Sequence, residues 1–178
     1  MESSDKILGD ITVLDLSQGV AGPYCAKLLA GLGAEVVKVE PPGGGDVSRG
    51  LGPFLEGASG TRQSALFLYL NTAKKGVTLD LENPASRDTM HGLVQDSDIL
   101  IESFPPGFLE GLNLGYPSLS KINPGLIHTS ITAFGQWGPY RDYQGSDIVA
   151  QAVGALMCTV GLPDREPLKI GGETALYT

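Results

Sequence analysis

The chain has 178 residues, of which 20 are acidic and 12 are basic, so its formal net charge is −8. The length predicts one domain or slightly more, and 42% apolar residues are typical of a folded chain rather than a disordered one. The acidic balance argues against a nucleic-acid partner, because binding to a phosphate backbone needs a surplus of lysine and arginine.

Cysteine, histidine and apolar patterning exclude several further classes. Two cysteines, Cys25 and Cys158, do not make a disulfide scaffold, and two histidines, His91 and His128, do not make a multi-histidine metal centre. The polar start of the chain predicts no signal peptide, and no apolar run is long enough for a membrane span. We therefore expect a protein of a reducing compartment, without a membrane partner or a metal.

The first elements in chain order form a βαβ unit. Ile11–Ser17 is an apolar run typical of a buried strand, and Pro23 suits the first turn of a helix over residues 24–33. Ala34–Glu40 predicts a second strand, which ends at two prolines. Two strands joined by a helix are expected to pair in parallel with a right-handed crossover.

The alternation continues after a long loop over residues 41–60, which we expect to be functional or mobile. Asn83 and Pro84 provide the cap and the first residue of a helix over residues 84–96. The other expected elements are strands at Gly76–Leu81, Asp98–Glu102 and Leu126–Ala133, a short helix at 105–112 and a helix at Asp147–Met157. The predicted fold class is α/β, with a doubly wound, mostly parallel sheet.

In such a sheet, ligands bind beyond the carboxyl ends of the strands. We therefore expect ligand-binding residues in the segments that follow the predicted strands. These segments are Ser17–Pro23, Glu40–Arg62, Leu81–Asn83, Glu102–Gly107 and Phe134–Asp147.

The turn after the first strand contains part of a dinucleotide-binding fingerprint. Gly19 and Gly22 follow that strand, and Glu40 stands where an acid would bind a ribose hydroxyl. The third glycine of the pattern is missing, and Pro23 removes an N–H group that would face a pyrophosphate. A structural tight turn is the favoured interpretation, and an NAD site is the alternative.

Charged residues near the strands each have two interpretations. Gly43–Gly45, with Asp46 and Arg49, forms either a loop that faces a phosphate or a flexible lid, and the chain has no P-loop motif. Lys74 and Lys75 are expected to be a solvated charge pair, with an anion contact as the alternative.

Three further polar residues are expected to have structural roles. His128, alone on a strand, is interpreted as a packed core residue, and Asp147 as an acid that stabilises the start of its helix. Glu173, after two glycines, is expected to be exposed, and it would act as a nucleophile only if a pocket oriented it.

The longest motifs of the sequence carry a family resemblance. The run ITVLDLSQGVAGPYCAKLLAGLGAEVVKVEPPGGGDVSR resembles the opening of the family III CoA-transferases, the CaiB/BaiF family. Further motifs that resemble this family follow in order: LNTAKKGVTLDL, SDILIESFPPGFLEGLNLGY, INPGLIHTSITAFGQWGPY, SDIVAQAVGALMCTVG and EPLKIGG. The resemblance covers essentially the whole chain without obvious gaps.

This resemblance implies an enzyme that transfers coenzyme A between an acyl-CoA and a small carboxylic acid, without a metal or a redox cofactor. It implies a Rossmann-like large domain, of which residues 1–178 would be the N-terminal part, and a small domain absent from this chain. It also implies a cytoplasmic enzyme, or one of an organelle matrix in a eukaryote. Its expected assembly is a homodimer or a hetero-oligomer with a related chain, with no nucleic acid and no membrane.

Carried over residue by residue, the similarity to the formyl-CoA transferase branch implies a coenzyme A site. The implied contacts are Val20, Ala21, Pro41, Leu79, Glu82, Ser103, Phe104, Pro105, Gln144 and Asp147. That branch commonly has an arginine where Pro41 stands, so one charge contact is missing here. It often has an asparagine at the position of Ser103.

The resemblance implies covalent catalysis by an aspartate that attacks the thioester. The position of that aspartate falls on Leu176, which cannot attack, so Glu173 is the remaining candidate. The racemase branch has a histidine where Ser146 stands, so racemisation is not favoured. The alternatives are an active transferase and a catalytically inactive coenzyme A-binding subunit or truncated relative, with an acyl-CoA racemase or an NAD-binding enzyme as minor options.

Overall fold

The computed structural model describes residues 6–57 and 60–177. Residues 1–5 of the expected polar start, residues 58–59 of the expected loop and Thr178 lie outside it. The chain forms two compact units that divide between Ile131 and Thr132. No helix among the described residues is long and apolar enough to cross a membrane.

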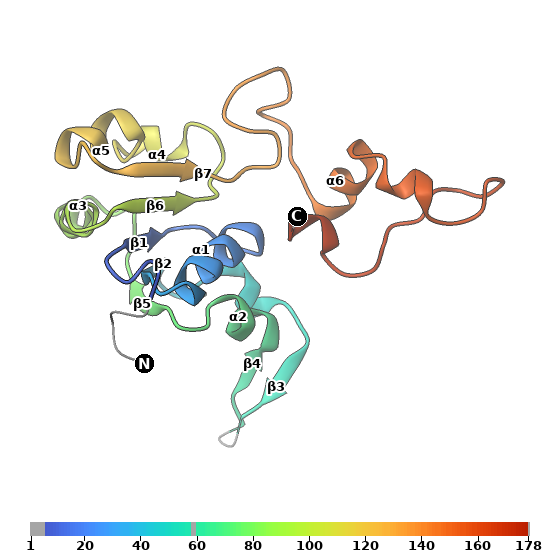
Figure 1. The fold of residues 1–178 in the computed structure, drawn as a ribbon, viewed down its shortest axis with the longest axis horizontal. Helices are drawn as coiled ribbons and strands as arrows, with labels where there is room; N and C mark the ends of the chain where they lie inside the picture. The colour runs from blue at the N-terminus through green and yellow to red at the C-terminus, as the bar shows by residue number, and fades with distance from the viewer. Residues whose placement is uncertain (1–5, 58–59, 178) are drawn as a thin grey trace. The chain divides into compact units, whose positions relative to one another are not determined.

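A five-stranded sheet organises the first unit (Figure 1). Its strands are β1 (Thr12–Asp15), β2 (Glu35–Glu40), β5 (Lys75–Thr78), β6 (Ile99–Glu102) and β7 (Ile127–Ser130). They lie in the order β5-β2-β1-β6-β7, and every neighbouring pair is parallel. This arrangement confirms the predicted α/β class and all five predicted strands of the parallel sheet.

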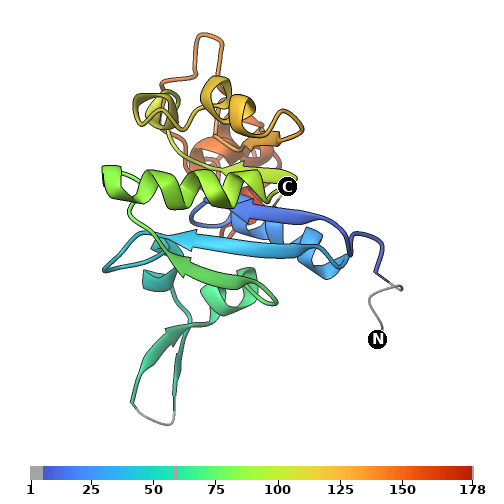
Figure 2. The ribbon, with the colours of Figure 1, turned by 90° about the vertical axis from the view of Figure 1, so that its left-hand side faces the viewer.

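Helices cover both faces of this sheet, and Figure 2 shows α3 crossing in front of the strands. Leu14 of β1 belongs to one buried cluster with Met90 and Val94 of α3, whereas the adjacent Val13 packs with Ala26 of α1. Burial on both faces explains why the strands appear in the sequence as apolar runs. The helices of this unit are α1 (Ala21–Gly31), α2 (Ala65–Leu70), α3 (Arg87–Gln95), α4 (Phe108–Gly111) and α5 (Tyr116–Ile122).

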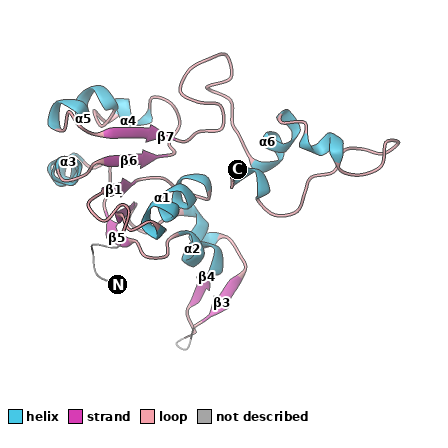
Figure 3. Cartoon of the chain, in the orientation of Figure 1, coloured by secondary structure: helices cyan, strands magenta, loops and turns pink. Residues whose placement is uncertain are grey.

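The prediction of a loop over residues 41–60 is wrong, because regular structure occupies much of it (Figure 3). Asp46 accepts a hydrogen bond from the Ser48 N–H (2.8 Å) and so caps a 3-10 helix, and Ser64 caps α2 in the same way. Two antiparallel strands of three residues lie between these caps, and they are too short to show an alternating pattern. The elements are η2 (Val47–Gly50), β3 (Phe54–Glu56) and β4 (Arg62–Ser64).

The four predicted helices differ from the observed ones at their ends, and the helices expected over residues 24–33 and 105–112 are observed as α1 and α4. The helix expected over residues 147–157 is shorter, because α6 (Asp147–Val153) ends at Gly154 and Ala155 adopts a left-handed φ of 58°. The helix expected over residues 84–96 begins as a 3-10 turn, capped by Asn83, and continues as α3. The sequence did not predict α5. The remaining 3-10 helices are η3 (Pro84–Ser86), η4 (Leu156–Thr159) and η5 (Thr174–Leu176).

The close approach of α1 to the end of β1 makes a stability prediction. A Cβ atom at Gly22 would overlap the Ser17 side chain, whereas one at Gly31 of the same helix would meet open space. We expect Gly22→Ala to lower the free energy of unfolding by about 1–3 kcal/mol, because the packed turn cannot yield. Gly31→Ala, the matched control, should raise it by about 0.5–1 kcal/mol. Urea unfolding followed by circular dichroism measures both, and equal effects would contradict this account.

Candidate functional site

A cavity of about 290 Å³ opens at the carboxyl ends of β1, β2, β5 and β6. Phe104 and Phe108 stack in its wall, with ring centroids 4.7 Å apart. The order in which strands are added to the sheet reverses between β1 and β6, and such a switch point is where this topology places a ligand. The full lining is Leu16, Gln18, Val39, Pro41, Leu79, Asp80, Leu81, Glu82, Phe104 and Phe108.

Four residues that the family resemblance implied as coenzyme A contacts meet in this cavity. They are Pro41 from the end of β2, Leu79 and Glu82 from the end of β5, and Phe104 from the end of β6. The other implied contacts lie outside the lining: Val20, Ala21, Ser103 and Pro105 in the first unit, and Gln144 and Asp147 in the second.

Side chains after β1 and β6 position the edge of the cavity. The Ser103 Oγ accepts a hydrogen bond from the Gln18 N–H (2.8 Å), and the buried Glu102 carboxylate accepts one from the Phe104 N–H (2.6 Å). Sequence reasoning missed Gln18 as a lining residue, although it lies in a segment singled out by topology. It also missed Phe108, which begins α4 four residues after Phe104.

A buried ion network lies beside the turn that follows β1. Lys38 of β2 is 2% exposed, and its ammonium group lies 2.8 Å from Asp46 and 3.8 Å from Asp15. It also donates a hydrogen bond to the Ser17 carbonyl. The sequence does contain a signal for this network, because Asp15 and Lys38 each interrupt an otherwise apolar run. Sequence reasoning did not use that signal.

Lys74 joins the same network from the segment before β5. Its Nζ lies 2.8 Å from Asp15 and donates hydrogen bonds to the Pro23 carbonyl (2.8 Å) and to Asn71 (2.9 Å). Burial lowers the pKa of Lys74, and the Asp15 charge offsets part of that effect. The expectation of a solvated pair is therefore wrong for Lys74. It is confirmed for Lys75, which is exposed.

The loop after β2 is tied to the same turn. Asp46 accepts hydrogen bonds from the N–H groups of Gly19 (3.0 Å) and Ser48 (2.8 Å), and its own N–H donates to Glu40 (2.9 Å). Two hydrogen bonds from Arg49 reach the Glu40 carboxylate (2.6 and 2.8 Å) and hold its pKa below the ordinary value. The Glu40 carboxylate is therefore already hydrogen-bonded within the protein. The structure gives no support to the NAD-site alternative, in which this acid would bind a ribose hydroxyl.

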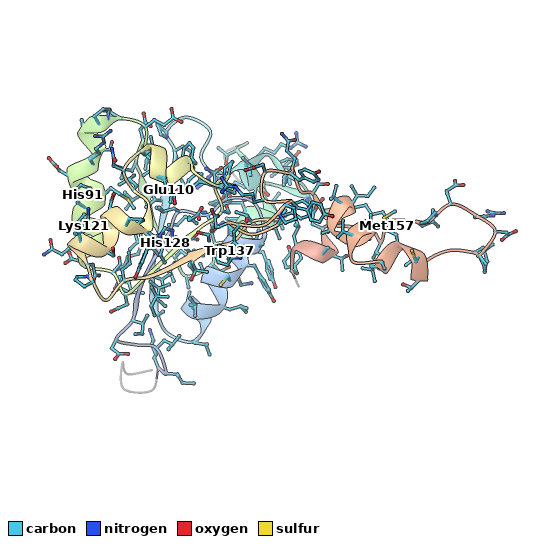
Figure 4. The ribbon with its side chains drawn as sticks, turned by 90° about the horizontal axis from the view of Figure 1, so that it is seen from above. His91, Glu110, Lys121, His128, Trp137 and Met157 are labelled. Carbon is cyan, nitrogen blue, oxygen red and sulfur yellow. The ribbon has the colours of Figure 1, made fainter. Side chains whose placement is uncertain are left out.

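His128 of β7 is packed in the interior, as the sequence predicted. Its side chain, labelled in Figure 4, is 8% exposed. Its Nε2 lies 3.9 Å from the Glu102 carboxylate. Burial lowers the pKa of His128, with Glu102 acting in the opposite direction. The group is outside the lining of the cavity, so it is not positioned as a base there.

In the second unit, Asp147 holds the end of the described chain. Its carboxylate accepts hydrogen bonds from the side chain of Gln151 (2.6 Å) and the N–H of Ala175 (2.7 Å), and it pairs with Lys169 (2.8 Å). Burial raises the pKa of Asp147, but the bonds from Lys169, Ala175 and Gln151 outweigh it and keep the pKa low. Asp147 therefore fixes the turn that contains Leu176.

That turn is the expected location of the nucleophile. Leu176 ends η5 and is partly buried, and its N–H donates to the Glu173 carbonyl (3.1 Å). Glu173 lies just before η5 with its side chain exposed, as the sequence predicted. Ser146 directly precedes α6.

The described residues contain neither a group of metal ligands nor a disulfide. Residues 6–57 and 60–177 contain no group of three or more histidine, cysteine or acidic side chains arranged to hold a metal ion. Cys25 and Cys158 are free thiols, the first partly buried and the second exposed.

Comparisons with known proteins give one family. CoA-transferase family III matches residues 8–178. Succinate–glutarate CoA-transferase of Agrobacterium fabrum is 41% identical over 170 residues, which is 94% of this chain and 42% of that protein. Subunit BbsE of the succinyl-CoA:(R)-benzylsuccinate CoA-transferase of Thauera aromatica is 41% identical over 157 residues, which is 88% of this chain and 38% of that protein.

Solved structures give the same result. A CaiB/BaiF family protein from Brucella suis matches with a TM-score of 0.90 at 40% identity, covering 97% of this chain and 46% of that one. The chain thus spans about two fifths of the length of the two curated relatives.

The adjacent lysines give a matched test of the buried network. Lys74→Met leaves Asp15 buried without its closest cation, so we expect a loss of about 3–5 kcal/mol in the free energy of unfolding. Lys75→Met removes only an exposed pair with Glu35 (2.6 Å), so a loss of about 0–1 kcal/mol is expected. Urea unfolding curves of the two variants measure the difference. Similar losses in both would show that Lys74 is not part of a buried network.

Proposed function

The chain belongs to CoA-transferase family III, and we propose that it binds coenzyme A in the cavity of its first unit, within an enzyme that transfers coenzyme A between carboxylic acids. The observation that carries this proposal is the meeting of Pro41, Leu79, Glu82 and Phe104 in one cavity. The family resemblance implied these positions as contacts, whereas the cavity follows from the fold. The two lines of support are therefore independent.

The chemistry of the first unit suits coenzyme A. The stacked rings of Phe104 and Phe108, among aliphatic walls, offer a surface on which an adenine base can stack. Val20 is the N-cap of α1 and Ala21 is its first residue, and the first N–H groups of a helix attract anionic groups such as a pyrophosphate, although Pro23 supplies no such group here. Backbone donors of this kind can serve a phosphate in a protein whose net charge is −8.

The proposed reaction uses a carboxylate of the enzyme as the nucleophile. The carboxylate oxygen attacks the thioester carbonyl carbon and the C–S bond breaks. Coenzyme A is released as a thiolate, and the acyl group stays on the enzyme as a mixed anhydride. The thiolate then attacks the enzyme carbonyl of the anhydride, which releases the donor acid and leaves an enzyme–CoA thioester. The acceptor acid takes coenzyme A by the same two steps in reverse. The name of the Agrobacterium relative makes dicarboxylic acids the first acceptors to test.

The carboxylate is assigned to Glu173 or to a partner chain. Leu176 occupies the expected position and has no nucleophilic atom. Glu173 lies one turn earlier on an exposed segment, so a rearrangement or a second chain would have to orient it. Because a second chain could supply the carboxylate, we propose a homodimer or a hetero-oligomer with a related chain. The proposed location is the cytoplasm or an organelle matrix.

Leu176 also favours a second candidate function, a coenzyme A-binding subunit without catalytic activity. The Thauera aromatica relative is itself named as a subunit, so a partition of roles between related chains has a parallel in the family. This candidate predicts binding of coenzyme A without transfer. No observation supports a racemase, because Ser146 stands where the racemase branch has its histidine. No observation supports an NAD enzyme either.

Binding is tested by calorimetric titration of the chain with coenzyme A. We expect Phe104→Ala to weaken binding by about tenfold, because a base stacked on an aromatic ring contributes about 1–3 kcal/mol. Phe54→Ala, which removes a ring from β3 outside the cavity, should leave the dissociation constant unchanged. Equal affinities of both variants and the unmodified chain would remove the cavity as the binding site.

Transfer is tested by incubation with succinyl-CoA and glutarate, followed by hydroxylamine trapping and peptide mass spectrometry. If Glu173 is the nucleophile, the hydroxamate forms on it, and Glu173→Gln lowers turnover by about a thousandfold or more. Glu166→Gln, a neighbouring exposed acid, should retain activity. No transfer and no labelled carboxylate, despite tight binding of coenzyme A, would reject an active transferase and support the binding subunit.

A further inference from the structure

The rim of the cavity in the first unit is acidic. Asp80 and Glu82 are the charged residues of its lining, and both are exposed. The remaining lining residues are apolar apart from Gln18. A ligand that enters the cavity therefore meets apolar walls and two negative charges.

Two basic side chains that bind the loop after β2 are already paired. Lys38 is 2% exposed and bound to Asp46 at 2.8 Å. Arg49 gives two hydrogen bonds to the Glu40 carboxylate, directly before the lining residue Pro41. A phosphate at the rim would have to break one of these two pairs to gain either cation.

Hydrogen bonds at the rim hold the Asp80 carboxylate and the backbone of Glu82. The Asp80 Oδ1 accepts a hydrogen bond from the Glu82 N–H (3.0 Å), and the Leu79 N–H donates to the Glu40 carbonyl (2.9 Å). Carboxylates only accept hydrogen bonds and repel other anions, so they match hydroxyl or amino donors rather than phosphate oxygens. The rim thus suits a ribose hydroxyl or an adenine amino group.

We propose that this cavity binds the adenosine part of coenzyme A through its base and a ribose hydroxyl, and that it does not select for the 3′-phosphate. 3′-Dephospho-coenzyme A and its acyl thioesters should then bind with the same affinity as coenzyme A and its acyl thioesters. We assign this lack of selectivity to Asp80 and Glu82, because a cation in their place would pair with the 3′-phosphate and favour coenzyme A. The inference rests on the proposed function, since it concerns the same cavity and ligand.

Calorimetric titration of the whole chain with coenzyme A and with 3′-dephospho-coenzyme A tests this inference. We expect dissociation constants within about threefold of each other, because the described residues that line the cavity include no lysine or arginine to pair with the phosphate. Tighter binding of coenzyme A by about tenfold or more overturns the inference and leaves the proposed function intact. Failure of both ligands to bind overturns the inference and the proposed function together.

A charge reversal at the rim provides the complementary test. Glu82→Lys should favour coenzyme A over the dephospho form by about tenfold, because the new ammonium group can pair with the phosphate. Glu56→Lys makes the same change on β3, outside the lining, and should leave the ratio unchanged. Equal shifts in both variants, or no shift in Glu82→Lys, would show that the rim does not set this specificity.

Discussion

The buried pairing of two lysines with two aspartates is the interaction on which the ligand-binding edge of the first unit depends. Lys38 and Lys74 face Asp15 and Asp46 with almost no exposure, so each charge is compensated only while the others stay in place. These groups also bind carbonyl and N–H groups of the turn Ser17–Pro23. The network therefore fixes the turn after β1, from which Gln18 reaches the cavity, and it links that turn to the loop after β2.

The centre of the sheet was predictable from the sequence because its inner strands, β2, β1 and β6, are buried on both faces. Val13 and Leu14 belong to different clusters, and a strand with both kinds of neighbour must be a continuous apolar run. The network was not predictable, because the partner of Lys74 lies 59 residues earlier, at Asp15, and local pattern does not reveal such a pairing. The β3–β4 hairpin was missed for a related reason, since three-residue strands show no alternation and are held by tertiary contacts.

The candidate site was predictable in part, and only with the family resemblance. The family resemblance implied Pro41, Leu79 and Phe104 as contacts, and all three lie in one cavity. Composition alone would not have separated them from other residues of the same types. Asp80 and Gln18 were missed, because their importance comes from where adjacent strands end rather than from their own neighbours in the chain. Together these residues describe a cavity with an aromatic wall and an acidic rim.

We propose above all that coenzyme A binds at the carboxyl ends of the parallel strands in the first unit. A crystal structure of the chain with coenzyme A is the decisive experiment. We expect the adenine ring to lie against Phe104 and Phe108, with its ribose beside Asp80 and Glu82. Density for coenzyme A at another surface, with this cavity filled by water, would contradict it.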